Sequence, residues 1–334
     1  MNKPFSTGVV IGKFMPPHLG HEYLFNFASL YCDELYILVD NFFGQTLSTS
    51  IRIDIIKKLM PNVHVLTFAN FMPQDPTTDK FWDIWKHGIE STVGKQINVL
   101  IAAMDYGTQL SNVLNCTFVP IDIERNSIPI SATMIRENPF KYWDFLTSPA
   151  KELYVKRIAV LGAESVGKTT AVKKLANEFN TIFVPEYAES VIARQGEFYP
   201  SNVSEFVQGQ YNSELALKKF ANKLLFTDTT VVSTLVWADI CFGHYDTDLE
   251  FYVNDYDLVL VFDYKDTTWV YDEHRNFLDN ETEITLCALR EEYQEKLINK
   301  LNNFNIPFVL VEGDYDTKYT TTKSLVEKLF VGSV

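Results

Sequence analysis

Cysteine is scarce in this sequence, and its thiols are not arranged as a metal site or a disulfide framework. Cys32, Cys116, Cys241 and Cys287 are far apart and never form a C-x-x-C pair, so we expect reduced and mostly buried thiols. Long apolar runs are also missing, since no stretch approaches the ~20 residues that span a bilayer. The N-terminus lacks the basic-then-apolar pattern of a signal peptide. We therefore predict a cytoplasmic protein that makes no membrane contact.

Positive charge is in short supply as well. The chain has 29 Lys and Arg residues against 43 Asp and Glu residues, which gives a net charge of −14. A general nucleic-acid binder needs a basic face that displaces counterions from phosphates, so this class of partner is excluded. Small nucleotides remain compatible, because a few local donors and a metal ion bind them. The length of 334 residues, 46% of them hydrophobic, predicts two soluble domains and leaves open whether they form a homo-oligomer.

Short apolar runs alternate with helical patterns along both halves of the chain. In the first half, the expected strands are residues 7–11, 35–39, 63–68, 99–102 and 118–121, and the expected helices are 18–31, 51–60 and 81–93. In the second half, the expected strands are 157–161, 181–184, 224–227, 258–262 and 308–311, and the expected helices are 168–179, 203–222 and 317–330. In the helix at 18–31 we place Leu19, Tyr23, Phe27 and Leu30 on one face.

The alternation breaks at the Thr-Ser-Pro segment at 147–149 and then restarts. We therefore predict one domain over residues 1–150 and a second over 151–334. Strands that alternate with helices favour parallel sheets covered on both faces. The predicted fold class is α/β, with two parallel-sheet domains.

The second domain begins with a phosphate-binding pattern. GAESVGKT at 162–169 fits G-x-x-x-x-G-K-[ST], and it lies between an expected strand and an expected helix. In such a loop the backbone N–H groups surround the phosphates, the lysine reaches the β- and γ-oxygens, and the hydroxyl binds Mg²⁺. The expected nucleotide-binding residues are Gly162, Glu164, Ser165, Val166, Gly167, Lys168, Thr169 and Thr170. Lys168 is also expected to act in catalysis, and Thr169 to be a metal ligand.

The first domain carries a different pattern directly after its first expected strand. GKFMPPHLGH at 12–21 places His18 and His21 on one face at the start of a helix. A helix N-terminus offers free N–H groups and a positive dipole end to an anion, and Gly20 lets a nucleotide approach the backbone. The two imidazoles are therefore candidates to stabilise negative charge on a phosphate under attack. The alternative is that His18 caps the turn and His21 packs in the core.

These residues resemble the nucleotidyltransferase superfamily, whose motif is G-x-F-x-P-x-H-x-G-H. A second signature of that superfamily, I-S-[GS]-T-x-x-R, is met by residues 130–136, with Ala132 in place of the usual glycine. Ser131 and Thr133 can cap a helix and donate to phosphate, and Arg136 can reach the β- and γ-phosphates. The expected site residues of this domain are Gly12, Lys13, Phe14, His18, Gly20, His21, Trp85, Ser131, Thr133 and Arg136.

The segment ENPFKYW at 137–143, with a P-loop domain behind it, narrows the resemblance. It is similar to the bifunctional nicotinamide-nucleotide adenylyltransferase/ribosylnicotinamide kinase family, the NadR type. The resemblance implies a Rossmann-like first domain that makes NAD from nicotinamide mononucleotide (NMN) and ATP. It implies a second domain that makes NMN from nicotinamide riboside and ATP, with Mg²⁺ in both. Some members carry an N-terminal helix-turn-helix; this sequence begins at its first strand, so we expect none here.

The resemblance also implies roles for residues outside the motifs. Trp85 is placed like a tryptophan that stacks on nicotinamide in related enzymes, although helix packing explains it equally well. Glu186 is expected to face the acceptor hydroxyl, or else to be only a helix N-terminal acid. Asp228 is expected to hold Mg²⁺ directly or through water, and the alternative role, a cap of the next helix, is compatible with it. The stretch at 268–275 is similar to a kinase lid, in which the implied binding and catalytic residues are Trp269, Asp272 and Arg275.

Some positions depart from the family pattern, and two other functions remain open. Ala188-Glu189 stands where Gly/Ala-Arg is common, so Arg194 is the candidate substitute, and Glu273 replaces a lid glycine. A coenzyme A pathway fusion of an adenylyltransferase and a kinase has the same two-domain order. A nucleotide sensor whose sites bind without turnover is the third reading. The 137–143 segment and the lid favour the NAD enzyme, and the intact histidines and P-loop lysine disfavour the sensor.

Overall fold

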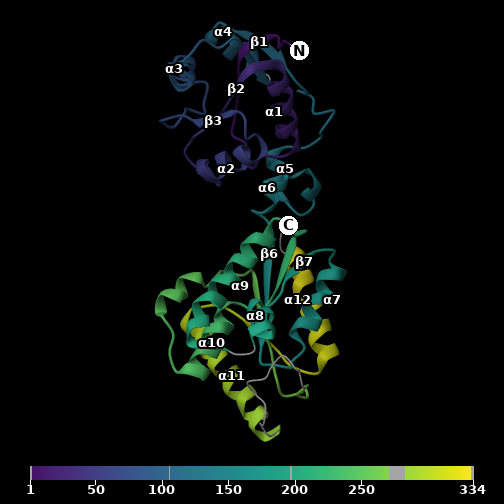
Figure 1. The fold of residues 1–334 in the computed structure, drawn as a ribbon. Coiled ribbons are helices and arrows are strands. Elements are labelled where there is room, and N and C mark those ends of the chain that lie inside the picture. Colours follow the sequence, from purple (N-terminus) through teal and green to yellow (C-terminus); the bar gives the residue numbers. More distant parts are fainter. Residues whose placement is uncertain (1, 105, 196–197, 271–282, 332–334) are drawn as a thin grey trace. The chain divides into compact units, whose positions relative to one another are not determined.

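The computed structural model describes residues 2–104, 106–195, 198–270 and 283–331, with the side chains of 195, 283–287 and 331 left aside. The chain divides into two compact units, Met1–Leu153 and Tyr154–Val334, which are described here one at a time. In the described residues each unit is built on one five-stranded parallel sheet (Figure 1). The predicted α/β class with two parallel sheets is therefore confirmed.

The first unit has the strand order β3-β2-β1-β4-β5. Its elements are β1 (Phe5–Gly12), α1 (Leu19–Tyr31), β2 (Cys32–Val39), α2 (Thr49–Leu59), β3 (His64–Thr67), α3 (Phe81–Val93), β4 (Val99–Ala102), α4 (Gly107–Leu114), β5 (Thr117–Pro120), α5 (Ala132–Glu137), a 3₁₀ turn (Trp143–Phe145) and α6 (Ser148–Lys151). The order reverses between β1 and β4, so the chain leaves these two strands in opposite directions. In open parallel sheets, ligands bind at this point, beyond the carboxyl ends of the strands.

Alternate side chains of β1 enter two separate hydrophobic cores in the first unit. Val10 packs with α1 and α2 on one face. Val9 and Ile11 pack with α3 and α4 on the other face. This is the burial expected of a parallel strand covered on both faces.

The buried side of α1 is different from the one expected from its periodicity. The helix buries Leu24, Phe25 and Ala28, whereas Tyr23 and Leu30 are exposed, Leu30 to 76%. The prediction of Leu19, Tyr23, Phe27 and Leu30 as one apolar face was therefore wrong as a guide to burial. The helix is apolar around most of its circumference, so spacing alone does not select the side that meets the sheet.

The second unit has the strand order β10-β9-β6-β8-β7. Its elements are β6 (Lys156–Gly162), α7 (Lys168–Glu178), β7 (Ile182–Val184), α8 (Tyr187–Gln195), a 3₁₀ turn (Pro200–Asn202), α9 (Val203–Lys218), β8 (Leu224–Asp228), α10 (Val231–Phe242), a 3₁₀ turn (Thr247–Tyr252), β9 (Leu258–Phe262), α11 (Glu283–Asn303), β10 (Val309–Val311) and α12 (Tyr315–Val331). β6 is the central strand and leads directly into the glycine-rich loop. Helices α7 and α12 pack together, and α10 packs with both α9 and α11 (Figure 1).

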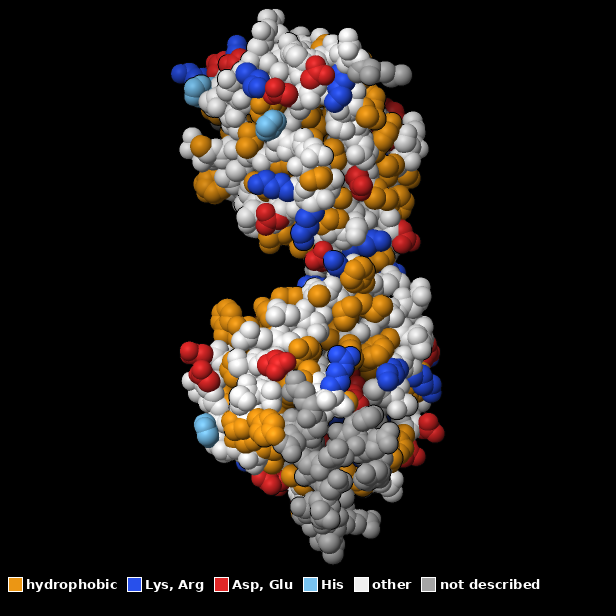
Figure 2. All heavy atoms as spheres, viewed as in Figure 1, with side chains coloured by type: hydrophobic (Ala, Val, Ile, Leu, Met, Phe, Trp, Pro, Cys, Tyr) orange, Lys and Arg blue, Asp and Glu red, His pale blue; other side chains and the backbone are white. Residues whose placement is uncertain are grey.

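On the face shown in Figure 2, acidic and basic side chains of the described residues lie scattered among one another. Among the helices described, none is long and apolar enough to cross a membrane. Cys32, Cys116 and Cys241 carry free thiols, but Cys241 is exposed, contrary to the expectation of buried cysteines.

Candidate active site

A cavity of about 550 Å³ opens at the carboxyl ends of β1 and β4 in the first unit. The predicted site residues Gly12, Lys13, Phe14, His18, Gly20, His21, Trp85, Ser131, Thr133 and Arg136 all line it. Segments more than 100 residues apart in the sequence therefore meet at one wall. The cavity forms at the strand-order reversal, where the topology places ligand sites in such sheets.

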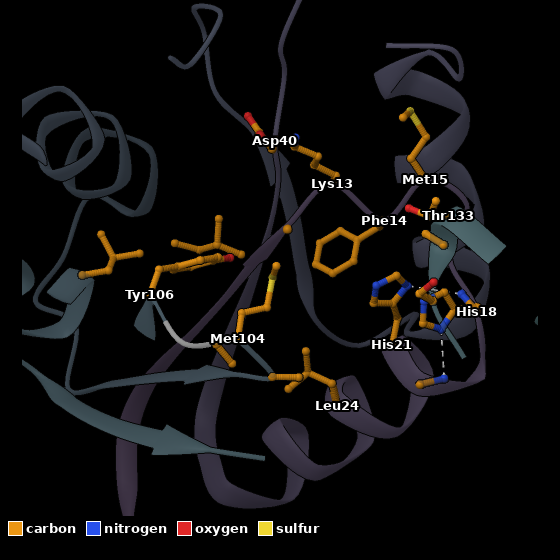
Figure 3. Close-up of a pocket in the computed structure, with 18 of the residues that line it drawn as sticks. Lys13, Phe14, Met15, His18, His21, Leu24, Asp40, Met104, Tyr106 and Thr133 are labelled. Carbon is orange, nitrogen blue, oxygen red and sulfur yellow. Dashed lines mark hydrogen bonds between the residues drawn. The ribbon is translucent and has the colours of Figure 1, made fainter. Parts of the chain in front are cut away.

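The two imidazoles are held face to face at the start of α1 (Figure 3). Their ring centroids are 3.7 Å apart. His18 Nδ1 accepts from the N–H of Gly20 at 3.2 Å, and His21 Nδ1 accepts from the N–H of His18 at 3.3 Å. His18 is thus both a cap and a cavity residue, so the capping alternative is confirmed and does not exclude a role for His18 in the cavity. A side chain at Gly20 would lie 3.1 Å from the His18 ring, which explains the glycine there.

The environment keeps both histidines neutral. Burial, with a smaller contribution from the nearby Arg125, lowers the pKa of His18 to about 4. Burial also lowers the pKa of His21 well below its usual range, with His18 and Arg125 as additional causes. Because each Nδ1 accepts a hydrogen bond, the proton of each neutral ring lies on Nε2. Both rings are therefore N–H donors and neither is a cation at neutral pH.

Positive charge near the imidazoles comes from side chains of three other segments. Arg136 on α5 donates to the carbonyl of Met15 at 2.5 Å and to the hydroxyl of Thr133 at 3.1 Å. Lys13 lies over the Phe42 ring at 4.6 Å. Arg125, at φ 53°, lines the cavity from the loop before α5. A left-handed conformation at a non-glycine residue is strained, and such strain concentrates at functional sites.

Ser131 has the capping role that its motif predicted. Its hydroxyl accepts from the N–H of Met134 at 3.2 Å at the start of α5. Thr133 lies within the first turn of α5 and is exposed toward the cavity. The position of both hydroxyls is therefore set by a single short helix.

An aromatic wall closes the other side of this cavity. Phe81, Trp82 and Trp85 of α3 line it together with Pro73 and Gln74. The Trp85 Nε1–H donates to the carbonyl of Pro73 at 3.1 Å, and its ring meets Phe68 edge-on at 5.5 Å. Trp85 thus packs in the unit and lines the cavity, so the two readings of this residue are compatible.

The glycine-rich loop of the second unit requires its glycines. Gly162 has φ 141°, and a Cβ there would lie 2.6 Å from the Phe262 carbonyl oxygen. Gly167 has φ 92°, and its Cβ would lie 2.7 Å from the Tyr315 ring. Only glycine fits such positions without strain. Lys168 begins α7, and its ammonium donates to the carbonyl of Ala163 at 2.8 Å.

A narrow cavity of about 90 Å³ adjoins this loop, and acidic groups surround it. Gly162, Glu164, Lys168, Thr169 and Glu186 are among its lining residues, whereas Thr170 lies exposed on α7. The pKa of Glu186 is raised to about 7, chiefly by burial; Lys168 opposes the rise, and the carboxylates of Asp228, Glu189 and Glu164 support it. Glu186 directly precedes α8, whose first N–H (Tyr187) donates to the buried Gln210 at 2.9 Å.

Asp228 ends β8 in a nearly water-free position, 1% exposed. Among the described residues, neither of its oxygens has a hydrogen-bond partner of ordinary geometry. The hydroxyl of Thr169 is nevertheless close enough to lower the Asp228 pKa, although burial raises it overall. The alternative role of Asp228 as a cap was wrong, because Thr230 is the N-cap of α10. The oxygens of Thr169 and Asp228, which the sequence predicted as metal ligands, thus lie side by side at the loop.

Of the three expected lid residues, only Trp269 lies within the described part of the chain. Trp269 is half-buried at the end of the described stretch, and the next residue, Val270, exchanges hydrogen bonds with the Ser165 hydroxyl. Val166 of the loop is buried. Asp272 and Arg275 lie outside the described residues.

Several cavity residues have no counterpart in the motifs. In the first unit these are Asp40, Tyr106 and Arg125; in the second they are Glu189, Trp237 and Tyr293. Asp40 directly follows an expected strand, and Arg125 lies five residues before the second signature, so strand ends and motif flanks were usable signals. Trp237 and Tyr293, with ring centroids 4.9 Å apart, come from α10 and α11. The sequence analysis gave no bounds for α10, which only the cap alternative of Asp228 implied, and it did not predict α11.

Comparisons with known proteins agree with this arrangement. Residues 157–318 match the family model of an AAA domain. The chain is 31% identical to the Trifunctional NAD biosynthesis/regulator protein NadR of Escherichia coli K12 and 30% identical to that of Salmonella typhimurium. Each alignment covers 97% of this chain and 83% of the relative.

Solved structures support the same fold. A crystal structure of NadR protein in complex with NR has a TM-score of 0.78 at 20% identity, covering 98% of this chain and 97% of that one. A crystal structure of NadR protein with NAD and AMP-PNP has a TM-score of 0.76 at 20% identity, covering 98% of both chains. Because it is 31% identical to a NadR protein over 97% of its own length and 83% of the relative's, the chain belongs to the NadR family.

Proposed function

We propose that this chain makes NAD by two ATP-dependent transfers. Residues 1–150 would join NMN to the adenylyl group of ATP, and residues 151–334 would phosphorylate nicotinamide riboside to NMN. The observation that carries the proposal is the presence, in one chain, of a paired-imidazole cavity and a P-loop cavity, each with an aromatic wall. Relatives named for NAD biosynthesis, and solved NadR proteins bound to NR, NAD and AMP-PNP, support the choice of substrates.

In the first unit, the NMN phosphate oxygen attacks the α-phosphorus of ATP. The bond from that phosphorus to the bridging oxygen breaks, and pyrophosphate leaves. We assign to the Nε2–H groups of His18 and His21 the stabilisation of charge on the α-phosphate, because neutral donors stay protonated on Nε2 across the physiological range. The three cations Lys13, Arg125 and Arg136 would hold the remaining phosphates of ATP. No side-chain nucleophile is required.

In the second unit, the riboside hydroxyl attacks the γ-phosphorus of ATP and ADP leaves. Glu186 would accept the hydroxyl proton, since a base with a pKa of about 7 is matched to neutral pH. Lys168 would neutralise the β- and γ-oxygens. Trp237 and Tyr293 would receive the cationic nicotinamide ring, which aromatic faces attract. Arg275, Asp272 and Trp269 keep their proposed roles in the lid.

Mg²⁺ fits the second unit by its donor set. Thr169 offers a hydroxyl, and the carboxylate of Asp228 is buried without a hydrogen-bond partner among the described residues. The structure forms no cluster of three or more His, Cys, Asp or Glu ligands within its described part, so phosphate oxygens of ATP would complete the coordination. When bound, the ion supplies charge neutralisation to the transferring phosphoryl group.

The pH dependence of the kinase tests the role of Glu186. The riboside kinase activity should rise with pH through a midpoint of about 7, because only the ionised carboxylate accepts the proton. Glu186→Gln should lower kcat by about 10²- to 10⁴-fold and remove that limb of the pH profile. Steady-state rates between pH 5.5 and 8.5 measure both. Glu205→Gln, an exposed carboxylate on α9, is the control; an unchanged midpoint in Glu186→Gln would contradict the assignment.

The proposal as a whole is tested by mass spectrometry of products from purified protein, ATP and Mg²⁺. One tube receives nicotinamide riboside and the other NMN, and NAD should form in both. NAD only from NMN would contradict the kinase assignment, and NMN accumulating from riboside without NAD would contradict the adenylyltransferase assignment. No product in either tube would favour coenzyme A pathway substrates or a non-catalytic sensor.

A further inference from the structure

Asp40 is a buried carboxylate in the wall of the first cavity. It follows the last residue of β2 and is 3% exposed. Its Oδ2 accepts from Gln74 Nε2 at 2.9 Å. Its Oδ1 is buried and has no hydrogen-bond partner in the part of the chain that is described. A buried oxygen that accepts no hydrogen bond is destabilising, so we expect a hydrogen-bond donor on a bound ligand to pair with Oδ1.

The cations near Asp40 leave Oδ1 available. The Arg52 guanidinium is fully buried and donates to the carbonyls of Lys13, Asp40 and Leu47 and to the side chains of Gln45 and Thr49. Its N–H groups therefore hold the two loops after β1 and β2. Lys13 lies beside Asp40 in Figure 3 but over the Phe42 ring. Burial raises the pKa of Asp40 above its usual range, and the hydrogen bond from Gln74 together with these two cations offsets only part of that rise.

The position of Asp40 separates the two ends of a mononucleotide. On one side is Lys13, and Phe14 separates it from the imidazoles that would receive the phosphates. On the other side Gln74, bonded to Asp40, follows Pro73, whose carbonyl accepts from Trp85. We consider a substrate whose phosphate lies at the imidazoles and whose ring points toward Trp85. Asp40 would then face the ring end of that substrate rather than its phosphate.

We propose that Asp40 determines the specificity of the first unit for the substituent on the pyridine ring, accepting a neutral carboxamide and rejecting a carboxylate. This rests on the proposed adenylyltransferase function. A nicotinamide mononucleotide brings a cationic ring and carboxamide N–H donors to Oδ1. A nicotinic acid mononucleotide brings a second carboxylate, which a buried anion repels and leaves without a donor. Asp40 acts here as a selector and takes no part in bond making.

The experiment compares the two mononucleotides in one enzyme preparation. The kcat/KM for dinucleotide formation is measured with NMN and with nicotinic acid mononucleotide, for wild type and Asp40→Asn. The wild type should prefer NMN, and the ratio should fall by about tenfold or more in Asp40→Asn, with the carboxylate substrate gaining in absolute terms. Asp40→Glu, which keeps the charge, should keep the preference. Partial misfolding lowers both values together and cancels in the ratio.

Each other outcome has a distinct meaning. An unchanged ratio in Asp40→Asn, whether or not both values fall, would overturn the proposal. Asp33→Asn, an exposed carboxylate at the opposite end of β2, should leave the ratio at the wild-type value. If wild type converts neither mononucleotide, the adenylyltransferase function itself fails, which is distinguishable from an altered or unaltered ratio.

Discussion

Replacing Lys168 with alanine should abolish phosphorylation of nicotinamide riboside while NAD formation from NMN continues at the wild-type rate. Lys168 begins α7 at the glycine-rich loop and faces the cavity that also contains Glu186. Removing a preorganised cation that stabilises a transferring phosphoryl group costs at least about 10²- to 10³-fold in kcat. The other cavity lies in a separate unit with its own core, so its chemistry should be unaffected.

The measurement uses both substrates with each variant, and the NMN reaction reports on folding of the rest of the chain. Lys219→Ala removes an exposed lysine at the end of α9 and serves as the matched control. Loss of both reactions in Lys168→Ala, with the protein still folded by circular dichroism, would refute two independent sites.

Replacing His21 with alanine should have the opposite effect. Adenylyl transfer should fall by about 10²- to 10³-fold, because one of two N–H donors to the attacked phosphate is lost. The riboside reaction should then stop at NMN, which accumulates. The variant also removes the acceptor for the His18 N–H at the start of α1, so a small loss of stability in the first unit is expected.

Liquid chromatography of the riboside reaction detects this accumulation directly. His87→Ala, an exposed histidine on α3, should convert riboside to NAD like the wild type. Should His21→Ala form NAD at an undiminished rate, the imidazole would be a structural cap alone, and the charge-stabilising role would pass to Arg136, Arg125 and Lys13.

The site residues whose positions the sequence predicted best are those that lie in short local motifs. The P-loop and the paired histidines each occupy about ten consecutive residues or fewer. Each motif forms wherever a strand precedes it and a helix follows it. The strand at 258–262 and the helix at 81–93 also agree with the observed bounds of β9 and α3. α11 was missed because its charged and apolar residues show no clear period over its length.

The tertiary structure decided what distant segments do together. Asp40 and Arg125 belong to no motif, and only the reversal of strand order at β1 brings them to the same cavity as His18. The neutral state of the histidines was likewise not readable from their spacing, because it depends on burial and on the charge of Arg125. Sequence determined the local phosphate-binding turns, since backbone conformation there follows from neighbouring residues. The tertiary structure determined the protonation state of the histidines and the aromatic lining of their cavity. Both depend on side chains that meet only when the sheet is assembled.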